Sequence, residues 1–185
     1  MTAAHTHTPV IEDTRRWLER AVIGLNLCPF AKAVHAKELV HFAVSEATDF
    51  APVLADLELE ADALQALPAG ERDTTLLMVP AGFDDFLLFT ELVRAGERLL
   101  ARKGLQGTLQ LASFHPQFVF ADAGKDDVAN CSNRSPWPTL HLLREASVDR
   151  AVAAFPQAEA IYQANIHTLQ QLGPQGWQAL GVDRS

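Results

Sequence analysis

Apolar positions recur along the chain with two different periods, and the alternation of these periods predicts an α/β fold. Apolar residues three and four apart indicate amphipathic helices, whereas short alternating or continuous apolar runs indicate strands. Helices are expected over residues 8–27, 49–67, 84–104, 138–146, 148–155 and 157–172. Strands are expected over residues 38–45, 74–80 and 107–114, with 117–121 either extending the third strand or forming a fourth. Because helices separate the strands, we expect a small mainly parallel or mixed sheet of three to four strands, flanked by helices and followed by C-terminal helices.

Three individual residues add detail to this outline. Thr8 suits the N-cap of the first helix and Pro9 its first turn. Residues 1–8 are therefore expected to form a flexible tail before a single α/β domain over residues 9–185. Gly96 lies on the apolar stripe of the helix expected over 84–104, which indicates that another element packs closely against it.

Composition and charge narrow the classes of partner. The 185 residues are 48% hydrophobic, enough for a real core, and carry a net charge of -8 with no basic run. Nucleic acids and anionic membranes are therefore not expected as partners. No apolar run has the length of a membrane span, no signal peptide is recognisable, and Cys28 and Cys131 make no disulfide framework, so a cytoplasmic location is expected.

The stretch "NCSNRSPWPTLHLLRE", residues 130–145, is the strongest candidate for a ligand site. Ser135 suits the N-cap of the helix expected to follow, whose first backbone N–H groups would favour an anion. Arg134 adds a charged fork that can hold a carboxylate or phosphate on two hydrogen bonds. Substrate binding is accordingly assigned to Asn133, Arg134, Ser135 and Arg144. The alternative is that Arg134 pairs with a nearby carboxylate and only locks the loop.

Four residues are candidates for catalysis, and each has a structural alternative. His115 lies where the third strand gives way to a long loop, so it can act as a general base or simply bond to the loop backbone. His141 and Glu145 are four apart on the expected helix, as in a carboxylate-oriented imidazole or an ordinary surface contact. Asp126, in an acidic pair, can take part in acid–base chemistry or mark a solvated loop tip.

The cysteines and the histidines leave a metal site open as an alternative. Cys28 follows a helix C-terminus, which disfavours a thiolate, whereas Cys131 lies near Arg134 in a position that favours one. Cys28, His115 and His141 supply metal-ligand atoms, but without the regular spacing of a metal motif. The chain contains neither a P-loop nor a GxGxxG motif, so no cofactor is assigned.

Three long motifs, "GLNLCPFA", "LASFHPQFVFA" and "NRSPWPTLHLLREASV", carry a family resemblance. The chain resembles the bacterial family known as domain of unknown function 1415, from about Trp17 to Leu172. The resemblance implies a cytoplasmic bacterial protein without an established activity, so it carries no catalytic role over to this chain. The family motif maps onto Cys28, Pro29, Phe30, His115, Pro116, Asn133, Arg134, Ser135, Pro136, His141 and Glu145.

Three functional hypotheses follow from the residues. The first is a hydrolase or transferase in which Arg134 and the helix start hold an anionic substrate and His115 moves the proton, assisted by Asp126, His141 or Glu145. It requires the imidazole of His115 to meet the guanidinium of Arg134, and it predicts that His115→Ala abolishes turnover with little loss of stability. The second is a non-catalytic protein that binds a ligand or regulatory partner, and the third is a metal-binding protein. Oligomeric state is left unassigned.

Overall fold

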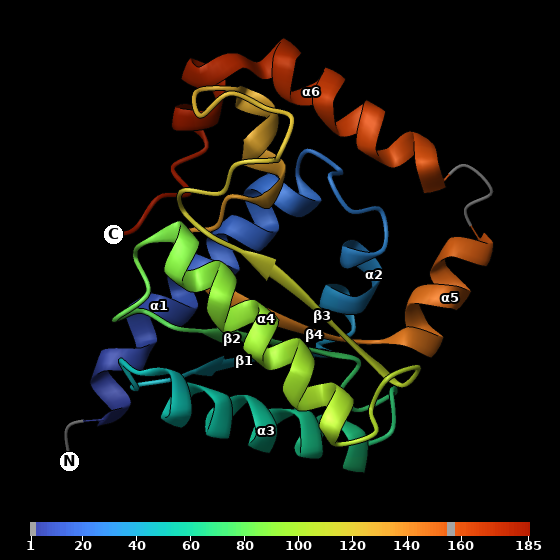
Figure 1. Cartoon of the computed structure of the whole chain (residues 1–185). Helices are drawn as coiled ribbons and strands as arrows, with labels where there is room; N and C mark the ends of the chain where they lie inside the picture. Colours follow the sequence, from blue (N-terminus) through green and yellow to red (C-terminus); the bar gives the residue numbers. More distant parts are fainter. Residues whose placement is uncertain (1–2, 155–157) are drawn as a thin grey trace.

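The computed structural model of the chain describes residues 3–154 and 158–185, and it contains one mixed sheet with helices on both faces (Figure 1). The strands are β1 (Val40–Val44), β2 (Thr74–Met78), β3 (Leu109–Phe114) and β4 (Thr139–Arg144). The helices are α1 (Ala3–Trp17), the π-helix η1 (Leu18–Ile23), α2 (Ala31–Ala36), α3 (Phe50–Ala66), α4 (Phe86–Arg102), the 3-10 helix η2 (Val128–Asn133), α5 (Glu145–Ala154) and α6 (Ala158–Ala179). No helix among these residues combines the length and apolar character needed to cross a membrane.

The strands lie in the order β1-β2-β4-β3, so the last strand of the chain enters the middle of the sheet. β1 and β2 are parallel, and β4 is antiparallel to both of its neighbours. The prediction of a small mixed sheet of up to four strands, flanked by helices and followed by C-terminal helices, is confirmed. The parallel pair arises as expected, because α3 forms the crossover between β1 and β2.

The helix predicted over residues 138–146 is wrong, because this segment is the central strand β4. Leu140 and Leu142 are fully buried on one face, while Thr139 and His141 lie on the other, which is the period of two that a strand requires. β2 and β3 together satisfy the backbone groups of β4 on both edges. Residues 117–121 are not a strand, so the fourth strand comes from a different part of the chain than predicted.

One helix end differs from prediction, and another agrees with it. α1 begins at Ala3 and contains Pro9 in its interior, whereas the first helix was expected to begin after Thr8. Residues 1 and 2 of the expected tail lie outside the described residues. The helix expected over residues 157–172 is interrupted at Gly173, as predicted, and a second helical stretch follows within α6 to Ala179. Gly173 has a φ of 67°, a left-handed conformation that favours glycine.

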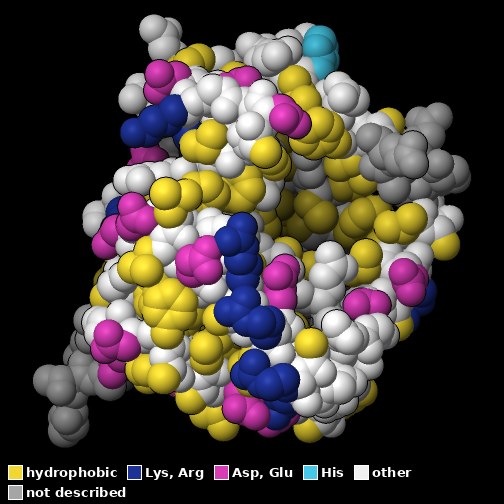
Figure 2. Space-filling model, viewed as in Figure 1, with side chains coloured by type: hydrophobic (Ala, Val, Ile, Leu, Met, Phe, Trp, Pro, Cys, Tyr) yellow, Lys and Arg dark blue, Asp and Glu magenta, His cyan; other side chains and the backbone are white. Residues whose placement is uncertain are grey.

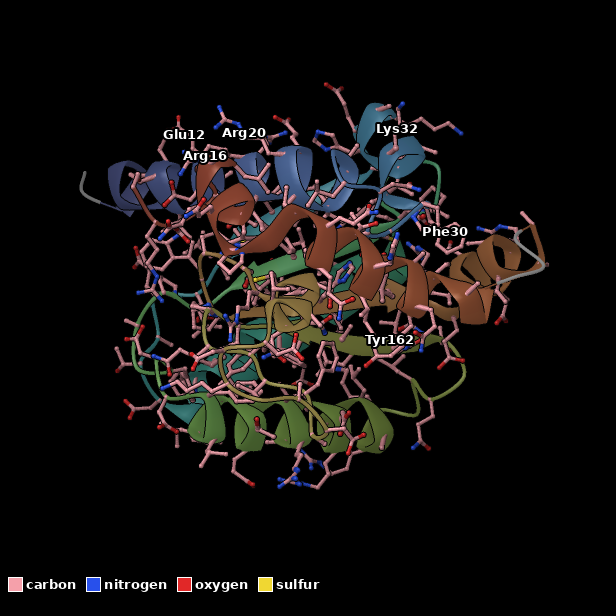
Figure 3. All side chains as sticks on the ribbon, turned by 90° about the horizontal axis from the view of Figure 1, so that it is seen from above. Glu12, Arg16, Arg20, Phe30, Lys32 and Tyr162 are labelled. Carbon is pink, nitrogen blue, oxygen red and sulfur yellow. The ribbon has the colours of Figure 1, made fainter. Side chains whose placement is uncertain are left out.

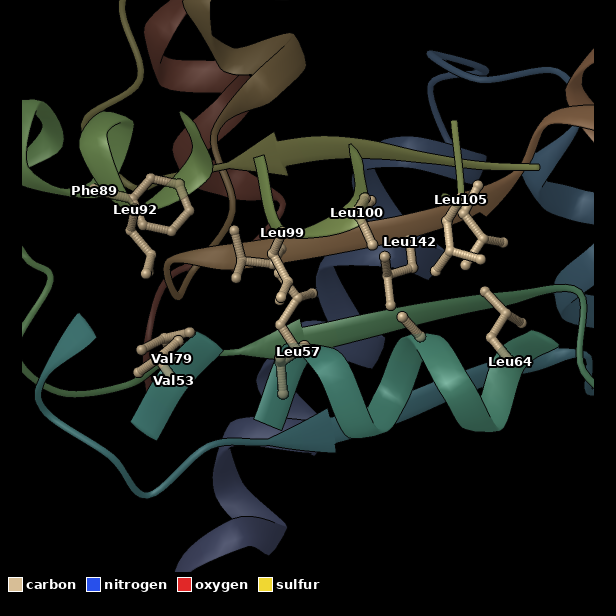
Figure 4. Close-up of a cluster of buried hydrophobic side chains, with 14 of the residues drawn as sticks. Val53, Leu57, Leu64, Val79, Phe89, Leu92, Leu99, Leu100, Leu105 and Leu142 are labelled. Carbon is tan, nitrogen blue, oxygen red and sulfur yellow. The ribbon is translucent and has the colours of Figure 1, made fainter. Parts of the chain in front are cut away.

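The main core lies between the sheet and the layer formed by α3 and α4 (Figure 4). Leu142 on β4 points toward this layer, which contributes Leu57 and Leu92. Leu77 and Leu140 belong to the same cluster, and all five side chains are buried. Burying each such side chain contributes roughly 1.5–3 kcal/mol of transfer free energy. This cluster anchors the sheet on which the candidate functional residues are placed.

The close packing predicted at Gly96 is confirmed. A methyl group added at this position would lie 2.8 Å from Cδ2 of Leu111 on β3 and 2.8 Å from Cδ2 of Leu57 on α3. The missing side chain therefore lets α4 approach both the sheet and its neighbouring helix.

The opposite face of the sheet is covered by α1 and η1 together with the end of the chain. Arg16 and Arg20, labelled in Figure 3, donate hydrogen bonds to the carbonyl oxygens of Gly181 and Leu180, at 2.8 and 3.0 Å. Val182 is buried in the same cluster as Trp17. Residues 180–185, here called the C-terminal segment, are thereby held against the first helices.

Candidate functional site

His115 is completely buried, and both of its ring nitrogens are engaged. Nε2 donates to the carbonyl oxygen of Phe83 at 3.0 Å, because a carbonyl can only accept, and Nδ1 accepts from the backbone N–H of Gln117 at 3.0 Å. The ring packs between Phe86 and Phe89 of α4. Burial lowers the pKa of His115, although the hydrogen bond to Phe83 acts in the opposite direction. The imidazole is therefore a neutral structural group with no free nitrogen for catalysis.

Arg134 follows Asn133, whose backbone contacts the backbone of His115. The His115 backbone N–H donates to the carbonyl oxygen of Asn133, so the two segments touch. The Arg134 guanidinium, however, turns toward the preceding loop, where it donates to the carbonyl oxygens of Phe118 at 3.2 Å and Lys125 at 2.7 Å. The two segments touch, but the imidazole does not meet the guanidinium as the enzyme hypothesis requires, because the two side chains bond to different parts of the chain.

The helix N-terminus predicted at Ser135 does not exist, which corrects the sequence-based anion site. The Ser135 hydroxyl is buried and donates to the carbonyl oxygen of Trp137 at 2.6 Å. This contact shapes the turn into β4, where Pro138 O accepts from Val79 N. Asn133 contributes its carbonyl oxygen to His115 and its side-chain oxygen to the Ser132 hydroxyl. Neither residue offers an array of free backbone N–H groups.

His141 and Glu145 do not share a helix face. His141 lies on β4, and Glu145 opens α5 with its backbone N–H bonded to the carbonyl oxygen of Thr108. The partner of the His141 imidazole is the hydroxyl of Thr74 on β2, at 2.7 Å from Nε2. Burial lowers the pKa of His141 to about 4.

Arg144 has a structural role that its position in the sequence did not reveal. Its guanidinium donates to the carbonyl oxygens of Leu64 and Leu67 at the end of α3, and of Arg72 just before β2. Carbonyl groups at a helix C-terminus lack partners within the helix and carry partial negative charge, so a guanidinium stabilises them. Arg144 therefore joins β4 to the end of α3.

A cavity of about 540 Å³, here called the Arg134 pocket, brings part of the predicted motif together. From the long loop and the turn before β4 it is lined by Pro116, Asp126, Val128, Cys131, Arg134, Ser135 and Pro136. Three of the predicted site residues, Asp126, Arg134 and Ser135, thus share one cavity. The other five, Asn133, His115, His141, Arg144 and Glu145, are not among its lining residues.

The remaining walls of the Arg134 pocket come from parts of the chain that sequence reasoning missed. They are Trp17 at the end of α1, Pro174, Trp177 and Gln178 on α6, and Val182, Asp183 and Arg184 of the C-terminal segment. Arg184 is fixed there by donating to the carbonyl oxygen of Pro136 and to Asp84, and it stacks on the ring of Trp137 at 4.2 Å. No local motif marks these residues, because only folding brings them to the loop.

The cysteine and metal hypotheses gain no support from the geometry. Burial raises the pKa of the Cys131 thiol, and the nearby charge of Arg134 only partly opposes this effect. Cys28 is half-buried and packs against the cluster around Trp17, as expected of a packed thiol. Among the side chains that the structure describes, those of residues 8–154 and 160–185, no three His, Cys, Asp or Glu groups are placed so that they could hold a metal ion, and this includes Cys28, His115 and His141.

Comparison with known proteins identifies a family but no function. A family model described as "Protein of unknown function (DUF1415)" matches residues 9–179. No curated protein and no solved structure matches the chain. The matched range ends before the C-terminal segment, which forms one wall of the Arg134 pocket.

Proposed function

We propose from the geometry that the protein, which belongs to this family of unknown function, binds a small organic anion in the Arg134 pocket. The observation that carries the proposal is an arginine that forms no ion pair with a described residue and lines a cavity of ligand size. Pockets for small molecules generally measure about 300–1,000 Å³ and combine apolar walls with a few polar groups. The Arg134 pocket fits this description.

The charge of Arg134 is available to a ligand. Its hydrogen bonds go to two carbonyl oxygens, which carry no net charge, and Arg134 forms no ion pair within the described part of the chain. The alternative considered from the sequence, a pairing of Arg134 with Asp126, Asp127 or Glu145, is therefore absent among these residues. A carboxylate or phosphate reaching the guanidinium would gain a charge-assisted hydrogen bond. Asp126 and Asp183 also line the pocket, so they would restrict the anion to the side near Arg134.

The apolar walls suit a ligand with a flat or branched hydrophobic body. Trp17, Trp177 and Val182 line the pocket from three elements that are held together by the core. Aromatic side chains supply large contact areas with little loss of side-chain entropy. A small aromatic or branched carboxylate meets both requirements of the site.

Binding is better supported than catalysis. Both ring nitrogens of His115 are engaged, and the raised pKa of Cys131 disfavours the nucleophilic thiolate. A hydrolase or transferase acting on the same anion is the second candidate, and it would require a base other than His115. A cytoplasmic location and the absence of a nucleic-acid partner stay predictions from the composition.

The proposal is tested by nuclear magnetic resonance with four probes: acetate, benzoate, inorganic phosphate and phenyl phosphate. Benzoate or phenyl phosphate is expected to shift the indole signal of Trp177 with saturation, and acetate and phosphate to bind more weakly. Arg134→Lys should weaken the stronger probe about tenfold, since a point charge replaces a fork, which corresponds to about 1.4 kcal/mol.

The matched control is Arg98→Lys, which makes the same change at an exposed position of α4. Because Arg134 also supports the loop, its variant is compared with Val182→Ala, which removes apolar contact from the pocket without touching these hydrogen bonds and keeps the Trp177 signal. If none of the four probes shifts the Trp177 signal, or if Arg134→Lys and Arg98→Lys bind the probe equally well, the proposal is rejected.

A further inference from the structure

Four charged side chains line the Arg134 pocket, and three of them have a charge left for a ligand. The guanidinium of Arg184 is paired with the carboxylate of Asp84 at 3.0 Å. Arg134 bonds only to carbonyl oxygens. Within the part of the chain that the structure describes, the carboxylates of Asp126 and Asp183 form neither an ion pair nor a hydrogen bond. The free charges in the pocket are thus one positive and two negative.

This arrangement opposes a ligand that carries a negative charge alone. Two free carboxylates share the pocket with the guanidinium of Arg134, and like charges repel. The protein as a whole carries a net charge of -8. Figure 2 shows acidic side chains spread over the visible face, whereas most of its Lys and Arg side chains form one band over α4, which does not line the pocket. A positive group on the ligand would turn the repulsion by the carboxylates into attraction.

Asp183 is the carboxylate that shares its surroundings with Arg134. Burial has the largest effect on the pKa of the Cys131 thiol and raises it, but the two charges also act on this pKa. The charge of Arg134 lowers it and the charge of Asp183 raises it. Because the effect of a charge falls with distance, both groups lie near the same wall of the pocket. Arg16 fixes the backbone of Asp183 by donating to its carbonyl oxygen at 2.9 Å.

An apolar wall adjoins this pair of opposite charges. Val182 directly precedes Asp183 and is buried, whereas Asp183 itself is exposed to the ligand side and to water. Val182 belongs to the same apolar cluster as Trp17 and Trp177, and all three line the pocket. A molecule with its charged groups at Arg134 and Asp183 can therefore place an apolar group against these side chains.

We propose that the ligand of the Arg134 pocket is an amino acid with an apolar side chain. Its carboxylate meets Arg134, its ammonium group meets Asp183, and its side chain packs against Trp177 and Val182. This ligand class rests on the proposed function, since the carboxylate of the amino acid is the organic anion that Arg134 binds. An amino acid is a zwitterion near neutral pH, so it supplies one charge of each sign and adds no net charge to an acidic protein.

The test uses three matched probes in nuclear magnetic resonance titrations at low ionic strength, followed at the indole signal of Trp177. They are phenylalanine, 3-phenylpropionate, which lacks the amino group, and phenethylamine, which lacks the carboxylate. Phenylalanine is expected to bind at least about threefold more tightly than either of the others, because each of them loses one charged contact.

Asp183→Asn separates the two charged contacts. It should weaken phenylalanine about threefold, and it should leave 3-phenylpropionate unchanged or bind it more tightly, because a repelling carboxylate is removed. The Asp183 side chain has no partner among the described residues, so the variant is expected to fold. The matched control is Asp122→Asn, which removes the same charge from an exposed loop position that does not line the pocket. It should change the affinities for the two probes equally.

The amino-acid ligand and the proposed anion binding can fail separately. If 3-phenylpropionate binds as tightly as phenylalanine, or if Asp183→Asn weakens both equally, the amino-acid ligand is rejected and anion binding stands. The same conclusion follows if benzoate or phenyl phosphate shifts the Trp177 signal and phenylalanine does not. Binding of phenethylamine alone would overturn both.

Discussion

The Trp137 indole Nε1 donates a 3.2 Å hydrogen bond to the Asp13 carboxylate, joining the turn before β4 to α1 across 124 positions of the chain. The same carboxylate accepts from Arg16 at 2.7 Å and from the Ser185 backbone N–H at 3.1 Å. Asp13 is 1% exposed, so this one buried group joins α1, the turn and the C-terminal segment. Those are also the parts of the chain that enclose the Arg134 pocket.

Asp13→Asn is expected to lower the free energy of unfolding at pH 7 by about 1–3 kcal/mol, because a donor group replaces an acceptor among three donors. Burial alone would raise the pKa of Asp13, but these hydrogen bonds lower it below its ordinary value of 3.8. The stabilisation is therefore complete above pH 3.8 and is lost as the pH falls through the lower pKa of the folded state. Urea unfolding at pH 7 and pH 3 measures this.

The control for this prediction is Asp149→Asn, at an exposed position of α5. It should change stability by less than about 0.5 kcal/mol at either pH. An Asp13→Asn protein as stable as wild type at pH 7 would show that the carboxylate contributes nothing to the junction.

His115→Ala is expected to cost about 2–4 kcal/mol of stability. The substitution leaves Phe83 O and Gln117 N without their partners and opens a cavity between the aromatic rings of α4. This reverses the sequence-based expectation of an unchanged thermal midpoint. Thermal unfolding of His115→Ala beside His167→Ala, an exposed histidine on α6, measures the difference. Similar midpoints for the two variants would contradict a structural role for His115.

His141 should make the protein less stable as the pH falls from about 6.5 toward 4. The unfolded chain takes up a proton near the ordinary value of 6.5, whereas the folded imidazole, with its pKa lowered to about 4, does not. The expected loss is about 3 kcal/mol, because one pKa unit corresponds to about 1.4 kcal/mol. Urea unfolding at pH 7.5 and pH 4.5 should show a smaller decrease for His141→Gln, which keeps a donor for Thr74, than for wild type. Equal decreases would mean that His141 is protonated in the folded state.

Gly96→Ala is expected to destabilise the protein by about 1–2 kcal/mol, although alanine is ordinarily the better helix former. The added methyl would lie 2.8 Å from side-chain atoms of both Leu57 and Leu111. Gly70→Ala is the matched control, because a methyl there would meet no atom within 4 Å. Chemical denaturation should place Gly70→Ala at or above wild-type stability. A stabilised Gly96→Ala would show that α4 can move away from α3 and β3 at no cost in free energy.

The pattern of hydrophobic residues predicted β1, α3, α4 and β3 from their periods, and β2 from a continuous apolar run too short for a helix. Residues 138–146 were mistaken for a helix because leucines at 140, 142 and 143 fit either period in so short a run. The pairing of β4 with β2 and β3 settled the matter, and it depends on strands that begin 65 and 30 positions earlier, at Thr74 and Leu109. Local spacing contains no information about such partners.

For the candidate sites, the sequence by itself indicated the loop region that contains Asp126, Arg134 and Ser135. The contact between the segments of His115 and Arg134 was a requirement of the enzyme hypothesis, which only the folded chain could test. Only the tertiary structure decided what each group does. A histidine is a base, an acceptor or a structural group according to the atoms that meet its two nitrogens, and these come from Phe83 and Gln117 for one ring and Thr74 for the other. The chemistry of a side chain is local, but its protonation, its direction and its access to water are set by contacts that only the folded chain makes.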